Sequence, residues 1–366
     1  MQSSRCIDTN MNTHKAALFL VLIACACVHV SCSKKQSGAQ TQTVVLYSSV
    51  DEPILRPIVQ AFEEKTGINV QLASDTEATK TTGLATRLRN EKNRPRADVW
   101  WSSEPMWTVQ LASEGVFEPI DQSIIDDATT GTAWPESCIG ENHMWIGFGL
   151  RARVIAYNTE ALDESSLPTT LAELADPEYK GRVGMAKPEF GTTRAHMAAL
   201  CSTWGNEAFE SWLTAMHENG LRLYDGNSSA VRAVALGEID FCLTDTDDIW
   251  NAQTQDWPVG VIYETIDDTI DPPSHGALLL ANTVAKVRND AHSDEADRLL
   301  NFLLSEDVER MLMESTSRNV PIRASLAEEL FTAHPQSRVD TPWFIHPNEI
   351  SAAESDAMQI VDRVLN

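Results

Sequence analysis

The stretch GEIDFCLTDTDDIWN, residues 237–251, places an apolar run directly before a group of acidic and hydroxyl side chains. Residues Ile239 to Leu243 have the character of a strand, and a helical pattern starts again at Ile249. The point where a strand ends and a helix begins is where open α/β sheets bind ligands. The polar residues at this point are therefore candidate site residues, namely Thr244, Asp245, Thr246, Asp247 and Asp248.

The acidic residues in this stretch have two interpretations. Carboxylates packed this closely repel one another, and a bound cation, protonation or solvent relieves the repulsion. Alternatively, the stretch only starts a helix, with Asp245 or Thr246 as its N-cap and Asp247 and Asp248 in the first turn, where the helix dipole favours negative charge. The residues elsewhere in the sequence are needed to distinguish a cation site from a helix cap.

Length and charge limit the kinds of protein that this chain can be. Its 366 residues exceed the usual size of a single hydrophobic core, so we expect two lobes. The sequence has 53 acidic residues against 28 Lys and Arg, a net charge of −25, which makes nucleic acids and anionic membrane surfaces poor partners. A cationic ligand suits such a protein better.

The first residues have the pattern of an export signal. A polar stretch, Met11 to Lys15, precedes the apolar run Ala16 to Val30, which is too short and too cysteine-rich for a membrane span. The sequence LIAC, Leu22 to Cys25, resembles a bacterial lipobox, so we expect Cys25 to carry the lipid, with Cys32 as the alternative. The mature protein is then periplasmic or on the cell surface, anchored to a membrane by lipid.

The region after residue 42 alternates between strand and helix patterns. Repeated strand–helix units predict right-handed βαβ crossovers and a mostly parallel sheet. Long extended stretches near 144–158 and 259–282 suit hinge strands that pass between two lobes. The expected organisation is an export signal at 1–32, a polar tether at 33–42, lobe 1 at 43–143 and 277–320, and lobe 2 at 144–276 and 321–366.

Polar loops follow the predicted strands in both lobes. In a parallel sheet these loops meet at the carboxyl ends of the strands, where one ligand can contact several of them. The stretch Gly191 to Arg194 opens a helix and offers backbone N–H groups, two hydroxyls and a guanidinium, which can hold an anion or simply cap the helix. The candidate ligand-binding residues are Ser48, Ser49, Ser102, Ser103, Thr192, Thr193, Arg194, Thr244 and Asp245.

Three cysteines, Cys138, Cys201 and Cys242, lie beyond the signal and the tether. Their spacing does not match a zinc-ligand motif. Because Cys201 and Cys242 fall in apolar helix and strand patterns, we expect these two to be buried thiols.

Five blocks of the sequence together resemble a known family. In chain order they are VVLYSSVDEP with AFEEKTGINV, ADVWWSSEP with LASEGVFEPI, KPEFGTTRAHMAAL, GEIDFCLTDTDD, and GALLLANTVAKV with LLNFLLSEDVERML. In their order and spacing they are similar to the extracellular solute-binding proteins of ABC importers, and more narrowly to the ferric-iron branch. The similarity runs from Thr43 to Pro321. It implies the type II periplasmic binding protein fold, an α/β protein with two lobes, a hinge and an interlobe cleft that closes on its ligand.

The resemblance also implies a metal site. Ferric binders of this branch that use tyrosine take a histidine from the first loop, a glutamate from the second and an adjacent tyrosine pair after the second-lobe strand. In this sequence the histidine position falls on Asp51, the glutamate on Glu104 and the tyrosine pair on Asp247 and Asp248. Carboxylates therefore replace the phenolates. Hard oxygen donors still suit Fe³⁺, and they also suit Ca²⁺, Mg²⁺ or Mn²⁺. The implied cargo is Fe³⁺, with Thr192 to Arg194 available for a co-anion.

Other ligands and one class of enzyme fit parts of this pattern. A polyamine, another divalent cation or a zwitterion such as 2-aminoethylphosphonate also satisfies clustered acids. The order Asp245-Thr246-Asp247 after an apolar strand resembles the nucleophile motif of Mg²⁺-dependent phosphohydrolases of the haloacid-dehalogenase type. That motif normally lies near the start of its domain, and here it lies two-thirds of the way along the chain. We therefore expect binding without catalysis, and no catalytic cofactor.

The expected partners follow from this interpretation. They are a membrane ABC permease and a small ligand, with no nucleic acid, and the chain is expected to be a monomer. Only a closed form brings Asp51 and Glu104 of one lobe within reach of Asp247 and Asp248 of the other, so the charge of the ligand is expected to stabilise closure.

Overall fold

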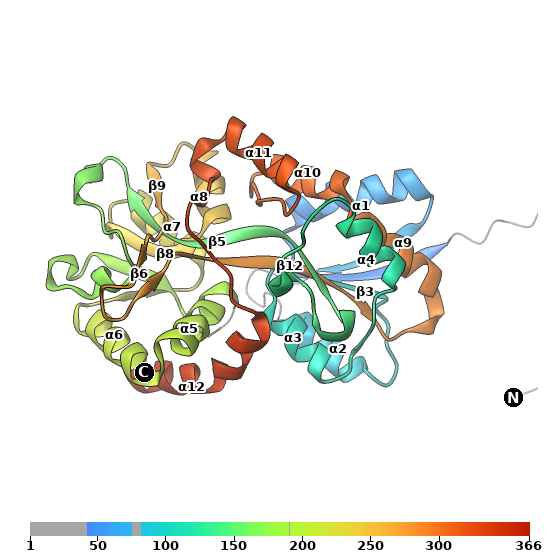
Figure 1. Cartoon of the computed structure of the whole chain (residues 1–366), viewed down its shortest axis with the longest axis horizontal. Helices are drawn as coiled ribbons and strands as arrows, with labels where there is room; N and C mark the ends of the chain where they lie inside the picture. The colour runs from blue at the N-terminus through green and yellow to red at the C-terminus, as the bar shows by residue number, and fades with distance from the viewer. Residues whose placement is uncertain (1–41, 75–81, 190) are drawn as a thin grey trace, which may run out of the picture. The chain divides into compact units, whose positions relative to one another are not determined.

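Two long strands at the centre of one mixed sheet organise the structure (Figure 1). The computed structural model describes residues 42–74, 82–189 and 191–366, which lie in the compact unit Thr41–Asn366. The strands are β1 Thr43–Ser48, β2 Asn69–Ser74, β3 Val99–Ser102, β4 Phe117–Glu118, β5 Ile146–Asn158, β6 Val183–Ala186, β7 Arg222–Tyr224, β8 Phe241–Asp245, β9 Val259–Ile262, β10 Ile266–Asp267, β11 Ser274–His275, β12 Ala277–Val287 and β13 Pro342–Trp343. The α-helices are α1 Glu52–Thr66, α2 Thr82–Glu91, α3 Met106–Ser113, α4 Gln122–Thr129, α5 Gly191–Trp204, α6 Asn206–Glu218, α7 Asn227–Ala235, α8 Thr246–Gln253, α9 Ser293–Leu303, α10 Glu306–Glu314, α11 Ala324–Ala333 and α12 Pro347–Leu365.

The strand β5 belongs to both halves of the sheet, whose order is β2-β1-β3-β12-β5-β8-β6-β7. Its first half pairs antiparallel with β12, and its second half pairs antiparallel with β8 and β9. On its other side β12 pairs with β3. The strands that cross between the halves are therefore β5 and β12, whereas residues 259–262 of the expected second hinge stretch form β9, which pairs with β5.

The sheet is parallel within each half and antiparallel at its centre. The strand β1 runs parallel to β2 and β3, and β6 runs parallel to β7 and β8, as strand–helix repeats predict. The two crossing strands run antiparallel to their neighbours in this order. The expected mostly parallel sheet is thus a mixed sheet, because a chain that passes between the halves and returns must reverse its direction.

Helices cover both faces of the sheet in each half, which explains why the strands read as almost unbroken apolar runs (Figure 1). In the half that contains β1, one core packs α1, α9 and α10 against the sheet, and a second core packs α2 and α3. In the half that contains β8, α5, α6 and α12 share one core, and α7 and α8 share another.

The last helix, α12, completes a core formed by much earlier parts of the chain. It packs against α5 and α6 of one half and against α3 of the other. Its side chains Ile350, Ala357, Ile360 and Val361 are buried in the same cluster as the apolar residues of α5. The terminal helix therefore contributes to the interior rather than to the surface alone.

The described cysteines Cys138, Cys201 and Cys242 are all free and buried, which confirms the expectation for the last two. Among the described residues, no helix has the length and hydropathy needed to cross a membrane. The candidate lipidation sites Cys25 and Cys32 lie outside the described residues.

Glu264, which follows β9, is a buried carboxyl far along the chain from the acidic stretch. It accepts hydrogen bonds from the backbone N–H of Leu171 at 2.8 Å and from the hydroxyl of Ser274 at 3.2 Å. Burial raises the pKa of Glu264 to about 7, against the smaller opposing effects of these two hydrogen bonds. Glu264 therefore links the loop at Leu171 to β11. The free-energy cost of burying its carboxyl is larger when the group is ionised.

We expect Glu264→Gln to stabilise the protein at pH 8 by roughly 2 kcal/mol relative to the parent and to have little effect at pH 5. The pKa of Glu264 is higher in the folded state than in the unfolded state, so its stabilising contribution is fully present below the unfolded pKa and is lost as pH rises through about 7. Urea unfolding at the two pH values measures the difference. An equal effect of the substitution at pH 5 and pH 8 contradicts this account.

Candidate ligand-binding cavity

A cavity of about 350 Å³ lies where strand ends from the two halves meet. The loops after β1 and β3 and the segment after α10 line one side, and the first turns of α5, α7 and α8 line the other. Arg151 of β5 and Asn282 of β12 reach it from the crossing strands. Its charged lining residues are Asp51, Glu104, Arg151, Asp225, Asp245, Asp247 and Asp248.

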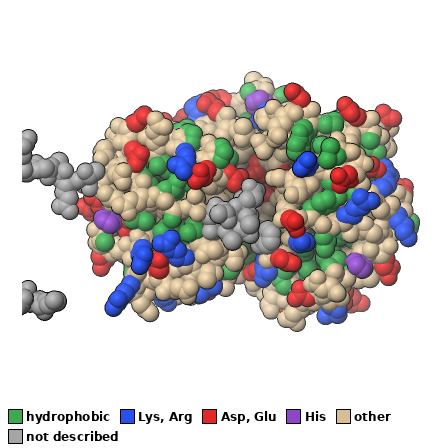
Figure 2. Space-filling view, turned by 180° about the vertical axis from the view of Figure 1, so that it is seen from behind, with side chains coloured by type: hydrophobic (Ala, Val, Ile, Leu, Met, Phe, Trp, Pro, Cys, Tyr) green, Lys and Arg blue, Asp and Glu red, His purple; other side chains and the backbone are tan. Residues whose placement is uncertain are grey.

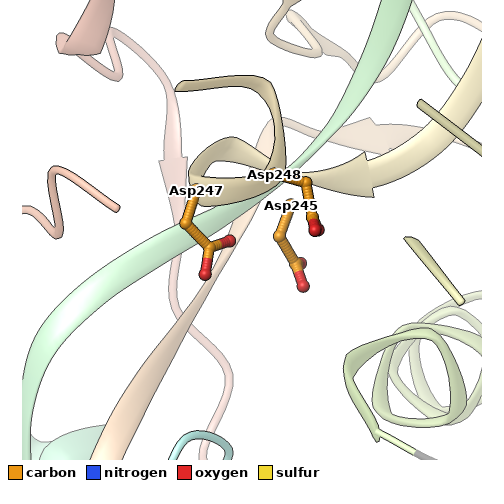
Figure 3. Close-up of side chains that lie close together, drawn as sticks. All are labelled: Asp245, Asp247 and Asp248. Atoms are coloured by element: carbon orange, nitrogen blue, oxygen red, sulfur yellow. The ribbon is translucent and has the colours of Figure 1, made fainter. Parts of the chain in front are cut away.

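The aspartates 245, 247 and 248 come together because β8 ends directly at the start of α8 (Figure 3). One carboxylate oxygen from each lies within 4.8 Å of the others. The helix does begin with Asp245 at the N-cap position, as the simpler interpretation of the sequence holds, but the Asp245 side chain makes no capping hydrogen bond. The three carboxylates are therefore directed to other partners.

Asp247 faces the cavity and is only partly neutralised. Its Oδ2 lies 2.7 Å from Nη1 of Arg151, while its buried Oδ1 has no hydrogen-bond partner among the described residues. Burial raises the pKa of Asp247 to about 7, Arg151 opposes this rise, and the neighbouring Asp248, Asp245 and Asp51 add to it. Asp247 thus has a buried oxygen without a partner, and a further positive group would stabilise its negative charge.

Asp248 is held by two hydroxyls. Its Oδ1 accepts a hydrogen bond from Ser228 at 3.0 Å, and its Oδ2 accepts one from Thr244 at 3.1 Å. Thr244 is fully buried and does not line the cavity, so it orients Asp248 instead of facing a ligand.

Asp245 is surrounded by donors. Its Oδ1 lies 2.9 Å from Nη1 of the buried Arg153, and its Oδ2 accepts hydrogen bonds from Thr192 and, at 2.9 Å, from Asn227. The carboxylate that the sequence offered as a phosphatase nucleophile is therefore ion-paired and hydrogen-bonded on both oxygens.

The other half contributes Asp51 and Glu104 to the same cavity. Asp51 is the N-cap of α1 and is exposed at the cavity edge. Glu104 is buried, and its two oxygens accept hydrogen bonds from the backbone N–H groups of Met106, at 2.6 Å, and Trp107, at 3.4 Å. Burial raises the pKa of Glu104 to about 7 although these two bonds oppose the rise.

Three of the four candidate serines, Ser49, Ser102 and Ser103, form a hydrogen-bond network between the loops after β1 and β3. Ser49 accepts a hydrogen bond from the backbone N–H of Ser103 at 3.0 Å, and its hydroxyl lies 3.4 Å from that of Ser102. Ser48 accepts from the backbone N–H of Val50 at 3.2 Å. Of these four serines, Ser103 lines the cavity. Ser49 and Ser102 connect the two loops, whereas Ser48 bonds within its own loop.

The candidate anion site is only partly assembled as expected. Thr192 and Thr193 line the cavity. Arg194 does not line it, because its guanidinium pairs with Glu354 of α12 and donates to the backbone carbonyl of Glu189 at 3.2 Å. The arginine at the cavity is Arg151 instead.

Sequence reasoning did not select Arg151, Arg153 or Asn227. The available signal was two arginines at alternate positions within a long apolar strand, which places both on one face of β5. A buried arginine needs a carboxylate partner, and the acids after β8 are the nearest candidates. For Asn227 we find no comparable signal, because an asparagine after a glycine is already explained by a turn.

The charges around the cavity leave an excess of acid. Asp225, Asp245 and Asp247 form ion pairs with Lys187, Arg153 and Arg151, respectively. Together with Asp51, Glu104 and Asp248, these residues carry a formal charge of −3 when all are ionised. Elsewhere on the surface acidic and basic side chains are interspersed, as Figure 2 shows for one face. The cavity therefore favours a positive guest more than the bulk charge alone indicates.

Two α/β halves joined by crossing strands around a lined cavity define a binding protein of the periplasmic type, and comparison with known families agrees. Residues 57–339 match the family of bacterial extracellular solute-binding proteins, and the chain belongs to this family. The family and the two-lobed fold that the sequence resemblance implied are thereby confirmed.

Similar proteins include several iron binders. The chain is 27% identical over 299 residues to the major ferric iron-binding protein of Neisseria meningitidis serogroup A, covering 82% of this chain and 86% of that protein. It is 27% identical over 302 residues to iron uptake protein A1 of Synechocystis, covering 79% of each. The structure of iron-bound HitA from Pseudomonas aeruginosa matches with a TM-score of 0.72 and 26% identity, covering 88% of this chain and 99% of that one.

Proposed function

We propose that this chain is the substrate-binding component of an ABC importer, which captures Fe³⁺ in the cavity between its lobes and delivers it to a membrane permease. The observation that carries the proposal is the meeting of acids from both halves at one cavity, with a formal charge of −3 after the three ion pairs are counted. The relatives named as ferric iron-binding proteins supply the identity of the cation.

The ligands that we propose for Fe³⁺ are carboxylates from both halves, namely Asp51, Glu104, Asp247 and Asp248. Carboxylate oxygens are hard donors that suit a small, highly charged cation. The unpartnered Oδ1 of Asp247 fits this role, because a buried anionic oxygen without a partner is costly until a cation reaches it. The five tyrosines of the sequence all lie within the described residues, and the cavity lining includes none of them.

A co-anion has a receiving group in Arg151. Its Nε is buried and has no hydrogen-bond partner among the described residues, although Nη1 contacts Asp247. Burial disfavours the charged guanidinium, but Asp247, Asp245, Asp248 and Asp51 outweigh this and raise the pKa of Arg151. Thr192, Thr193 and the N-terminal ends of α5 and α7 also line the cavity, and helix N-termini favour an anion. In this proposal Arg151 replaces Arg194 as the anion-binding arginine.

Closure of the lobes is the proposed mechanism of capture. The division that we propose is lobe 1 at 43–143 and 277–320 and lobe 2 at 144–276 and 321–366, with β5 and β12 as the connecting strands. Asp51 and Glu104 then belong to one lobe and Asp247 and Asp248 to the other. A cation bound between them lowers the free energy of the closed state relative to the open state by its differential affinity for the two.

The oligomeric state, the membrane anchor and the absence of catalysis are also part of the proposal. We propose a monomer, anchored to the membrane by lipid on Cys25 or, alternatively, Cys32, that binds its cargo without chemical change. The saturation of Asp245 by Arg153, Thr192 and Asn227 supports binding without catalysis, because a phosphatase nucleophile needs an accessible oxygen.

A thermal-shift screen tests the cargo directly. Ferric citrate at a hundred times its dissociation constant is expected to stabilise the protein by about 2.7 kcal/mol, which raises the melting temperature measurably. Citrate alone, Fe²⁺, Mn²⁺, Ca²⁺, 2-aminoethylphosphonate and polyamines serve as comparison ligands. We expect ferric citrate to give the largest shift.

The alternatives make opposite predictions in the same screen. Stabilisation by 2-aminoethylphosphonate or a polyamine, with no response to ferric citrate, replaces the ferric proposal with an organic cation or zwitterion. The combination of Arg151 with the surrounding acids is the observation that keeps a zwitterion as the second candidate, because such a ligand carries both signs of charge.

A further inference from the structure

We infer that Asp245 is a positioning residue, which holds the lobe-2 wall of the cavity in place and does not bind the cargo itself. The inference rests on the proposed ferric function. It separates Asp245 from Asp247, although one oxygen of each lies within 4.8 Å of the other and both residues line the same cavity.

The hydrogen bonds of Asp245 leave little capacity for a metal ion. Oδ1 receives Nη1 of Arg153, and Oδ2 receives both Thr192 and Asn227. Asp247 differs, since its Oδ1 is buried without a partner among the described residues. Asp247 therefore has an oxygen that still lacks a partner, whereas both oxygens of Asp245 already accept hydrogen bonds, three in all.

Arg153 explains why Asp245 has to remain where it is. The Arg153 side chain is 0% exposed and that of Asp245 is 3% exposed, so each charge depends on the other for compensation. The register of the sheet places the two residues directly opposite each other on β5 and β8. Among the described residues Arg153 also donates to two neutral groups, the hydroxyl of Thr192 and Nδ1 of His196, both at 3.3 Å. Removing one member of such a buried pair is strongly destabilising because it strands the other charge.

The same carboxylate fixes the cavity wall. Thr192 is the second residue of α5, and Asn227 is the first residue of α7, and both line the cavity. Asn227 also donates to Thr192 at 3.2 Å and accepts from Thr193 at 3.1 Å. Asp245 thus joins the strand β5 to the first turns of two helices. Loss of outer groups that orient a metal site typically weakens metal binding by about 10- to 100-fold.

The test compares Asp245→Asn with Asp247→Asn, an identical substitution two positions away. For Asp245→Asn we expect the melting temperature of the cargo-free protein to fall by about 5 °C or more. We expect its affinity for ferric citrate to weaken by about 10- to 100-fold, with an unchanged ferric EPR line shape in the bound form. Asp247→Asn should instead change the EPR line shape or abolish the bound signal, with a smaller change in melting temperature.

A second variant separates positioning from stability. Arg153→Met combined with Asp245→Asn removes both buried charges, so the melting temperature should recover toward that of the parent while ferric affinity stays low. Recovery of affinity together with stability overturns the positioning role. An altered EPR line shape in Asp245→Asn, or an unchanged melting temperature and affinity, also overturns it.

Thr192→Val is a milder variant that tests the same contact. Should Asp245→Asn not fold, Thr192→Val removes one contact of the carboxylate without changing any charge, and we expect it to weaken ferric binding by about tenfold. Unchanged affinity in Thr192→Val then counts against the inference. Failure of the parent protein to bind ferric citrate is a different result, because it rejects the proposed function and not the arrangement around Asp245.

Discussion

Replacing Asp247 and Asp248 together by asparagine is expected to weaken ferric binding by at least about a thousand-fold, which corresponds to about 4 kcal/mol. In the proposed site each aspartate places a negative charge beside a trivalent ion, and a pair of unit charges about 4 Å apart interacts by about 4 kcal/mol at intermediate dielectric. Asparagine preserves the shape and one oxygen but removes the charge. Calorimetric titration with ferric citrate measures the loss.

The cargo-free double variant should melt within about 3 °C of the parent protein. The substitution relieves repulsion among neighbouring acids, which offsets the lost ion pair with Arg151. The charge of Arg151 is still stabilised by Asp245 and Asp51. Asp268→Asn combined with Asp290→Asn, both at exposed positions, also removes two negative charges; it is the control for the change of net charge and should bind as the parent does. Parental affinity in the double variant removes the basis for the proposed ligand set.

Ferric binding is expected to weaken steeply as the pH falls below 7. In the cargo-free protein burial raises the pKa of both Glu104 and Asp247 to about 7, so both carboxyls lose their charge in mildly acidic solution. A metal ion requires the ionised form, and each group that must release a proton costs up to about tenfold in affinity per pH unit. Between pH 7.5 and pH 5.5 we expect a loss of roughly a thousand-fold. Competition against a chelator of known ferric affinity at each pH measures it.

Glu104→Gln removes one of the two carboxyls that must release a proton before the metal ion binds. This variant should bind more weakly at pH 7.5, and the slope of log affinity against pH should be shallower by about one unit. The stability of the cargo-free parent should change in the opposite direction, because raised carboxyl pKa values stabilise the folded state at low pH and lose that effect as the pH rises through about 7. Ferric affinity that is constant from pH 7.5 to 5.5 contradicts this account.

Local pattern was sufficient to predict the elements around the site. The apolar run before Asp245 predicted a strand and the residues after it a helix, and the structure has β8 Phe241–Asp245 followed by α8 Thr246–Gln253. Polar loops after β1 and β3 were expected to face the same ligand, and Asp51 and Glu104 do line one cavity with Asp247 and Asp248. Strand ends in an α/β sheet converge, so the sequence order of the loops already contains this information.

Pairing between distant segments could not be predicted in the same way. Arg153 and Asp245 are 92 residues apart in sequence, and they meet because β5 is the neighbour of β8 in the sheet. Arg194 is diverted from the cavity by Glu354, which is 160 residues away. Local periodicity indicates which face a side chain takes, but it does not indicate which strand or helix lies opposite, and ionic partners depend on that choice.

The position of α12 has a consequence for biosynthesis. Its buried residues Ile350, Ala357, Ile360 and Val361 complete an interior that α5 and α6 begin well over a hundred residues earlier. A growing polypeptide on the ribosome therefore lacks part of this interior until α12 has been synthesised. Until α12 docks, the apolar faces of α5 and α6 that it covers stay exposed, and exposed apolar surface of this kind makes an incomplete chain prone to aggregate.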